Sequence, residues 1–351
     1  MPPTTAPQRI LIIRPSSLGD VIRTVPALVS LRRAYPAAKI DWLVNENLAA
    51  AVEHHPDLTS IVPFARGAIG TQLKAGNIAG PWRWAERALR EPAYDLVIDY
   101  QGLFRSGLMT WLTRSPRRVG YADARELGWL GYTQRVRTQP PHHVDRVLAL
   151  TRALGVDAVC DLKLYPDARD REAVAGELGG KRYVLFAPTT RGLGRAWPIE
   201  RYAELARRLF ERRTELGIDA LVVTGMESER AYCGPLLSSL PSSPPSFLDD
   251  RIGKTTISGL MALIERAALV VCNDSAAMHM AVAFARPMVA LLGASDAAHA
   301  GPYGRFVDVI QHKDPGAPHH VRHRDVAKAS ELMKRISVDE VAAACEARLK
   351  S

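Results

Sequence analysis

The chain has 351 residues, of which 47% are hydrophobic and 24% charged, as expected for a globular protein with enough apolar side chains for large cores. Basic residues exceed acidic ones by nine, 46 against 37, which favours partners that carry phosphate or lie at a membrane surface, although a solvated arginine-rich face gives the same count. The sequence lacks a membrane-spanning apolar run, a secretory signal and closely spaced cysteines, so we expect a protein of the reducing cytoplasm.

Short apolar runs alternate with helical patterns in the first half of the chain. The expected strands are residues 10–13, 40–44, 60–64 and 96–99, and the expected helices are 20–34, 47–54, 82–91 and 103–114. Strands and helices in alternation form parallel sheets covered by helices.

The second half repeats this plan after a polar stretch at 164–182, which we interpret as a linker. Its expected strands are 183–187, 220–224, 269–273, 288–292 and 307–311, and its expected helices are 199–214, 228–238, 257–267 and 275–285. The stretch 238–246, rich in proline and serine, predicts an exposed loop.

Two Rossmann-like domains with parallel sheets that face each other across a cleft follow from this pattern. We place the first domain at residues 1–167 and the second at 168–336, with a last helix at 337–351. Ligands of such sheets bind at the carboxyl ends of the strands.

The segment ILIIRPSSLGDVIRTVPAL, residues 10–28, places Asp20 where a buried strand turns into a helix. A carboxylate there can take a proton in catalysis, or it can simply stabilise the helix dipole.

A second strand-to-helix turn, LVVCNDSAAMHM, begins at residue 269. Backbone N–H groups at the helix start attract phosphate, small side chains allow close approach, and Ser275 adds a hydroxyl donor; an ordinary N-cap is the alternative. We interpret Cys272 as a core residue.

The segment APTTRGLGRAWP, from residue 187, brings hydroxyls of Thr189 and Thr190 beside the charges of Arg191 and Arg195. Arginine pairs well with a diphosphate, although a solvated basic loop has the same composition. In VVTGMESER, Glu229 follows a strand and can hold a ribose, or can act as a first-turn carboxylate.

Several common motifs are absent. Neither a dinucleotide-binding G-x-G-x-x-G after the first strand nor a P-loop occurs, which argues against a nicotinamide dehydrogenase and a P-loop NTPase. The histidines at 142–143 and 319–323 lie in charged, loop-like contexts, and we expect solvated surface rather than a metal site there.

Taken in order, SSLGDVIRTVPAL, DLVIDYQGLFRSGL, TTRGLGRAWP and NDSAAMHMAVAFARP resemble the heptosyltransferases of lipopolysaccharide core synthesis, which form glycosyltransferase family 9 and have the GT-B fold. The resemblance covers about residues 9–350 and is closest to heptosyltransferase I. It implies inverting transfer of L-glycero-D-manno-heptose from ADP-heptose to a Kdo sugar on lipid A, at the cytoplasmic face of the inner membrane. It implies no cofactor, no metal and no nucleic-acid partner.

The resemblance also implies roles for individual residues. Asp20 is the general base. The donor-binding residues are Thr189, Thr190, Arg191, Arg195, Glu229, Asp274, Ser275, Ala276 and His279. The acceptor-binding residues are Ser17, Gly19 and Gln101, and we expect Arg105, Arg117 and Arg118, in the basic stretch 105–137, to dock the anionic acceptor electrostatically.

Three features depart from the family pattern: Ala276 stands where glycine is common, Arg195 stands where lysine is common, and residues 314–330 match no family motif. Two other functions remain open at this point. A sugar-nucleotide 2-epimerase with the same fold would need no acceptor, and a non-catalytic nucleotide-sugar-binding protein would bind donor without turnover.

Overall fold

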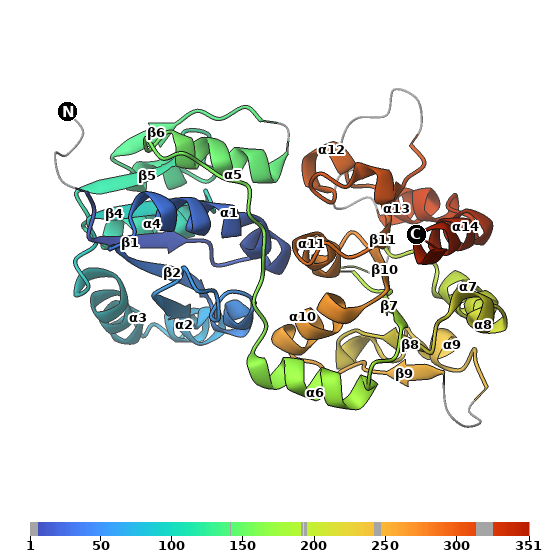
Figure 1. Ribbon diagram of the computed structural model, residues 1–351. Coiled ribbons are helices and arrows are strands. Elements are labelled where there is room, and N and C mark those ends of the chain that lie inside the picture. Colours follow the sequence, from blue (N-terminus) through green and yellow to red (C-terminus); the bar gives the residue numbers. More distant parts are fainter. Residues whose placement is uncertain are drawn as a thin grey trace. The chain divides into compact units, whose positions relative to one another are not determined.

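The computed structural model describes residues 6–140, 142–190, 192, 195–241, 247–313 and 326–350. The chain forms two compact units, Met1–Tyr165 and Pro166–Ser351, each with its own sheet and core (Figure 1). The predicted boundary after residue 167 lies two residues beyond this division.

The sheet of unit 1 has six parallel strands in the order β3-β2-β1-β4-β5-β6. The strands are β1 (Arg9–Ile13), β2 (Lys39–Asn45), β3 (Ser60–Phe64), β4 (Leu96–Asp99), β5 (Arg117–Tyr121) and β6 (Gln134–Val136). The first four confirm the prediction. The other two were missed because RRVGY and QRV contain polar residues that are half-buried or exposed.

Helices connect these strands. They are α1 (Leu18–Ala34), the 3-10 helix η1 (Glu46–Ala51), α2 (Arg66–Lys74), α3 (Ala79–Ala85), the π-helix η2 (Glu86–Arg90), α4 (Phe104–Leu112), the 3-10 helix η3 (Gly128–Gly131) and α5 (His143–Arg152). The expectation that the histidines at 142–143 are solvated loop residues is wrong for His142, which is buried and caps α5 by accepting a hydrogen bond from Val144 N at 3.1 Å.

The sheet of unit 2 also has six parallel strands, in the order β12-β11-β10-β7-β8-β9. They are β7 (Tyr183–Ala187), β8 (Ala220–Val223), β9 (Leu248–Asp250), β10 (Leu269–Asn273), β11 (Met288–Leu291) and β12 (Val309–Ile310). The sequence missed β9, which is short and acidic, and overestimated the length of β12.

The helices of unit 2 are α6 (Ala168–Leu178), α7 (Ile199–Glu211), α8 (Arg213–Leu216), η5 (Glu227–Glu229), α9 (Gly234–Leu237), α10 (Ile257–Arg266), α11 (Ala276–Ala283), α12 (Ala297–Ala300), η6 (Phe306–Asp308), α13 (Val326–Lys334) and α14 (Val338–Lys350). The helix predicted at 228–238 is two short helices, η5 and α9, separated by a turn. None of the described helices combines the length and apolar character that a membrane span requires.

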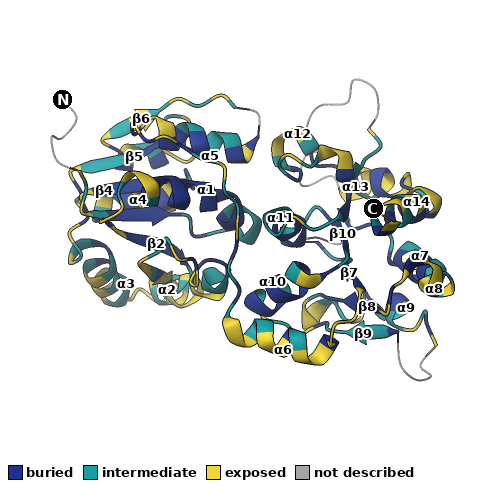
Figure 2. Cartoon of the chain, viewed as in Figure 1, coloured by how far each residue is buried: buried dark blue, intermediate teal, exposed yellow. Residues whose placement is uncertain are grey.

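The stretch predicted as a linker at 164–182 is mostly helix α6. Asp167 caps its start by accepting a bond from Arg169 N at 2.7 Å, and Gly179 ends it in the left-handed conformation. Only Val174 and Leu178 of α6 are buried, so its polar outer face hid the helical pattern (Figure 2).

The last helix, α14, belongs to the core of unit 2. Val341 and Cys345 pack into the same apolar cluster as Trp197, whose indole N–H donates to the Ile336 carbonyl at 2.9 Å. Cys272 is fully buried in β10, as predicted.

Three glycines bring α4 and η3 of unit 1 into direct backbone contact. A Cβ at Gly107 would collide with the backbone of Gly128, and a Cβ at Gly131 would collide with the backbone of Gly107. These positions therefore require glycine because two segments of main chain meet there.

Gly107→Ala is expected to lower the free energy of unfolding by about 1–3 kcal/mol, because the added methyl group must push two backbones apart. Gly70→Ala in α2 is the matched control: nothing lies within 4 Å of a Cβ there. Alanine has a greater helix propensity than glycine, so Gly70→Ala should raise the free energy of unfolding by up to about 1 kcal/mol. Urea unfolding measures both; equal effects of the two substitutions would contradict the backbone contact.

Candidate functional site

The carboxyl end of β1 lies between those of β2 and β4, since Ile13 is aligned with Leu43 on one side and with Asp99 on the other. The chain then enters α1, whose N-cap is Ser17. Both the backbone N–H and the hydroxyl of Ser17 donate to Asp20 Oδ2, at 3.1 and 3.0 Å. One oxygen of Asp20 is thus held by the start of its own helix.

The other oxygen of Asp20 faces two arginines. Arg14 Nη2 lies 3.0 Å and Arg23 Nη2 2.5 Å from Oδ1, and both arginine side chains are largely buried. Burial by itself raises the pKa of Asp20, but the charges of Arg14 and Arg23 and the bonds from Ser17 outweigh it and hold the pKa far below its usual range. Asp20 is therefore ionised at every physiological pH.

The two arginines have spare donors. Within the described part of the chain, Arg14 Nε and both Nε and Nη1 of Arg23 are buried without a hydrogen-bond partner. Buried guanidinium donors are normally paired, so this cluster of positive charge suits an anion. His143 lies within electrostatic reach: loss of hydration and then the Arg23 charge lower its pKa, so that its ring is neutral near pH 7.

A second layer fixes the loop after β4. Gln101 Oε1 accepts from Ser16 N at 3.3 Å, while Gln101 N donates to Asp99 at 2.8 Å. Asp99 is fully buried and also accepts from the Tyr132 hydroxyl at 2.6 Å. The predicted residue Gln101 therefore does contact the β1 loop; Asp99 was not predicted.

The predicted acceptor-binding arginines have different surroundings. Arg105 is exposed on α4. Arg118 donates to the carbonyls of Gly131 and Ser115 at 2.9 and 2.5 Å, and Arg117 reaches the Leu154 carbonyl at 3.5 Å. Arg117 and Arg118 thus hold the backbone of unit 1.

The arginines that surround Asp20 are Arg14 and Arg23, which the sequence interpretation did not select. The available signal was the spacing in RPSSLGDVIR, where Asp20 and Arg23 are three residues apart on one helix. Gly19, between Leu18 and Asp20, lies in the first turn of α1.

In unit 2 the loop after β7 is attached to the end of β10. Asn273 is fully buried, donates from Nδ2 to the Pro188 carbonyl at 2.7 Å and accepts at Oδ1 from Trp197 N at 3.0 Å. One amide therefore fixes both ends of the loop that contains the predicted phosphate-binding residues. The sequence interpretation gave Asn273 no role.

The end of β8 meets the same loop. Thr189 Oγ1 donates to Glu229 Oε2 at 2.8 Å, and Met226 N donates to the same oxygen at 2.7 Å. The structure thus brings the predicted residues Thr189 and Glu229 together. Thr190 is 7% exposed and donates to the Gly192 carbonyl at 2.9 Å.

The turn from β10 into α11 contains four more of the predicted residues. Asp274 accepts a bond from the Ser295 hydroxyl, Ala276 is the first residue of α11, and His279 is buried one turn further on. Ser275 is the N-cap, yet within the described residues its buried hydroxyl has no partner. An unpaired donor beside the free N–H groups of a helix is suited to a phosphate oxygen.

Arg195 begins the return of the β7 loop toward Trp197, with its N–H bonded to the Gly192 carbonyl at 3.1 Å. Arg191 and the histidines at 319–323 lie outside the described residues. Across the described part of the chain, no three His, Cys, Asp or Glu side chains come together in a way that could hold a metal ion.

Comparison with known proteins gives consistent matches. A model of glycosyltransferase family 9 (heptosyltransferase) matches residues 82–329. Lipopolysaccharide heptosyltransferase 1 of Pseudomonas aeruginosa is 31% identical over 317 residues, which are 88% of this chain and 85% of that relative. Among solved structures, ADP-heptose heptosyltransferase II of E. coli has a TM-score of 0.77 at 22% identity, over 97% of this chain and 98% of that one. E. coli heptosyltransferase WaaC with ADP has a TM-score of 0.75 at 25% identity, over 97% and 99%.

Asn273→Ala is expected to lower the free energy of unfolding by roughly 2–4 kcal/mol, because it leaves the Pro188 carbonyl and the Trp197 N–H buried and unpaired. Calorimetric unfolding measures the loss. Asn77→Ala is the control, since Asn77 caps an exposed turn before α3. A loss no larger than that of the control would show that Asn273 does not fix the loop.

Proposed function

The chain belongs to glycosyltransferase family 9, the heptosyltransferases, and on that basis we propose that it transfers heptose from ADP-heptose to a Kdo sugar on lipid A, with inversion at the anomeric carbon. The family match confirms the resemblance found in the sequence, and the two parallel α/β sheets with their solved relatives confirm the GT-B fold. Acceptor, stereochemistry and residue roles are the proposal.

The observation that carries this proposal is the Arg14–Asp20–Arg23 cluster. It combines an ionised carboxylate with buried guanidinium donors that have no partner among the described residues. A Kdo sugar offers both a hydroxyl to attack with and a carboxylate to bind. The arginines would hold the acid, and Asp20 would face the hydroxyl.

Asp20 acts in this scheme as the base. Its low pKa makes it a weak proton acceptor toward a resting hydroxyl, so proton transfer occurs late, when the new C–O bond has made the hydroxyl proton acidic. An acceptor carboxylate on Arg14 and Arg23 would also weaken their hold on Asp20 and raise its pKa. A single direct displacement inverts the anomeric carbon and needs no enzymic nucleophile.

The leaving ADP gains negative charge as the bond breaks. In the proposal its phosphates lie at the start of α11, where Ser275 has an unpaired hydroxyl, and Arg195 and Thr190 approach from the β7 loop. Glu229, already fixed by Thr189, would accept bonds from the ribose. Asp274, Ala276 and His279 would line the sugar, and the ADP held by the related E. coli enzyme supports this choice of nucleotide.

The remaining parts of the proposal follow from these substrates. Arginine and helix N–H groups neutralise the diphosphate, so we propose a reaction without cofactor or metal. A nucleotide-sugar donor and a lipid-linked acceptor place the enzyme at the cytoplasmic face of the inner membrane, as a peripheral protein.

The proposal is tested by incubating the full chain with ADP-heptose or other ADP- and UDP-sugars, with and without delipidated Kdo acceptor, and measuring free nucleotide. We expect ADP release from ADP-heptose only when the acceptor is present. Conversion of the sugar nucleotide without acceptor would indicate an epimerase instead, and binding without turnover would indicate a non-catalytic protein.

Asp20→Asn is expected to lower kcat by at least ~10²-fold while donor affinity stays near that of the wild type, because the amide cannot take the proton. Asp170→Asn is the matched control, since Asp170 occupies the same first-turn position in α6. Steady-state kinetics measure kcat. Wild-type turnover in Asp20→Asn would remove Asp20 from the base role.

Arg195→Ala is expected to weaken ADP binding by roughly 1.5–3 kcal/mol, the range for a hydrogen bond to a charged group. Arg207→Ala, on the exposed side of α7, should leave the affinity unchanged. Titration calorimetry with ADP measures both variants. Equal affinities would place Arg195 away from the diphosphate.

A further inference from the structure

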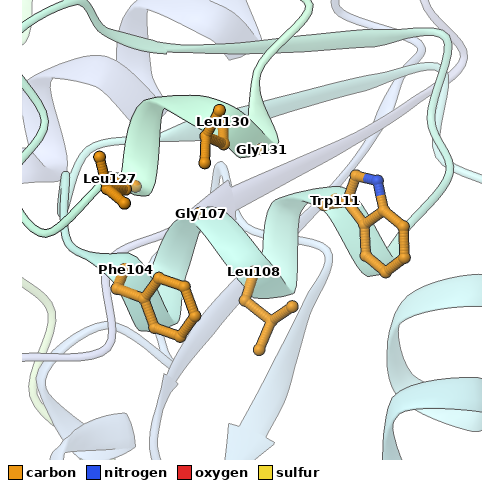
Figure 3. Close-up of a pocket in the computed structure, with 8 residues that line it drawn as sticks. Phe104, Gly107, Leu108, Trp111, Leu127, Leu130 and Gly131 are labelled. Carbon is orange, nitrogen blue, oxygen red and sulfur yellow. The ribbon is translucent and has the colours of Figure 1, made fainter.

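Unit 1 has an exposed apolar face that its core does not use. Phe104, Leu108 and Trp111 of α4 and Leu127 and Leu130 beside and within η3 form this α4–η3 face, with 42–57% of each residue exposed. Together with the glycines beneath them they line a shallow hollow of about 200 Å³ (Figure 3). Large apolar side chains gathered on one surface indicate an interaction site.

The backbones beneath the α4–η3 face are packed against each other. Gly107, Gly128 and Gly131 bring the two segments so close that a Cβ at any of these positions would collide with backbone atoms. Figure 3 shows Phe104, Leu108 and Trp111 on α4 with Leu127 and Leu130 on the neighbouring segment. Backbone packed in this way loses little conformational entropy when a partner covers the face.

Backbone strain marks the same face. Glu126 and Leu127 are consecutive residues in the left-handed region, with φ of 56° and 62°. Leucine is unfavourable there, whereas asparagine tolerates this conformation well. A strained leucine that is 57% exposed covers little of its side chain in the fold, so strain and exposure together indicate a function for its side chain.

The chain segment that contains the face is strongly basic. Residues 104–137 contain seven arginines and only two acidic residues, Asp123 and Glu126. Asp123 pairs with Arg146 at 2.6 Å. The guanidinium of Arg135 lies 4.2 Å above the ring of Trp129, so this arginine and tryptophan form one amphipathic group. Apolar side chains bordered by arginine and tryptophan suit the boundary between anionic headgroups and acyl chains.

We propose that the α4–η3 face inserts into the surface of an anionic lipid bilayer. The inference rests on the proposed function, which makes the protein peripheral at a membrane, and names the surface that binds the lipid; lipid binding of this face does not depend on which sugar is transferred. It also connects to the site, because Arg125 N donates to the Gly102 carbonyl at 2.9 Å and the adjacent Gln101 contacts the β1 loop. These bonds connect the face, through the loop after β4, to the loop between β1 and α1.

The test measures binding of the full chain to vesicles made of equal parts phosphatidylglycerol and phosphatidylcholine, by flotation, together with thermal unfolding. Leu127→Asn should weaken vesicle binding roughly fivefold, as the loss of one partly inserted leucine implies. Its Tm should stay equal or rise, because asparagine relieves the strain. Trp111→Ser provides a second variant and should weaken binding at least as much.

Val307→Asn is the control, since Val307 is 86% exposed in unit 2, outside this face. It should bind vesicles like the wild type, and vesicles of phosphatidylcholine alone should bind the wild type weakly. Unchanged vesicle binding in Leu127→Asn and Trp111→Ser would overturn the proposal. A lower Tm of Leu127→Asn with vesicle binding intact would also overturn it. If the wild type is a dimer in sedimentation and both variants are monomers, the face belongs to self-association and the proposal is overturned as well.

Discussion

The ion cluster at the end of β1 is the constraint on which the candidate site of unit 1 depends. Asp20 is surrounded by Arg14, Arg23 and the start of its own helix, and this arrangement exists because β1 is central in its sheet. The strand delivers Arg14, and helix α1 delivers Asp20 and, one turn later, Arg23. The cluster therefore follows directly from the fold, and its spare donors define what unit 1 can bind.

In unit 2 the corresponding donors at a strand end are neutral. Asn273 at the end of β10 fixes the neighbouring loop by two buried bonds, and Ser275 then starts α11 with an unused hydroxyl. In both units, some polar groups near a strand end form hydrogen bonds within the unit, while others have no partner among the described residues. The leftover groups are cationic in unit 1 and are a hydroxyl and helix N–H groups in unit 2, so each suits an anionic ligand of different size and charge.

The sequence predicted the parts of the structure that have a strong local signal. Buried parallel strands are continuously apolar, so β1, β7 and β10 were placed correctly, and Asp20 and Ser275 were placed at helix starts. Strand β5, strand β6 at the sheet edge and helix α6 were missed because each carries polar side chains that interrupt the apolar pattern.

The partners of Asp20 were missed for another reason. Arginines Arg14 and Arg23 are unremarkable in the sequence, while Arg117 and Arg118 form a visible basic pair. Only the folded chain shows that the pair holds backbone carbonyls and that the two single arginines are buried beside a carboxylate. The spacing of Asp20 and Arg23 on one helix was the local signal, but that spacing does not show whether the side chains are buried or which way the loop before the helix turns Arg14.

The central claim is that Arg14 and Arg23 keep Asp20 ionised whenever the enzyme works. The pH dependence of kcat/KM with ADP-heptose and a delipidated Kdo acceptor tests it most directly, since this ratio reports the ionisation of the free enzyme and free substrates. We expect no loss of activity from protonation of Asp20 as the pH falls from 8 to 5, because a carboxylate with a lowered pKa stays ionised well below that range. The claim would be contradicted if kcat/KM fell with decreasing pH between 6 and 7 and Arg23→Gln moved this fall to higher pH, because the carboxylate would then titrate in the working range.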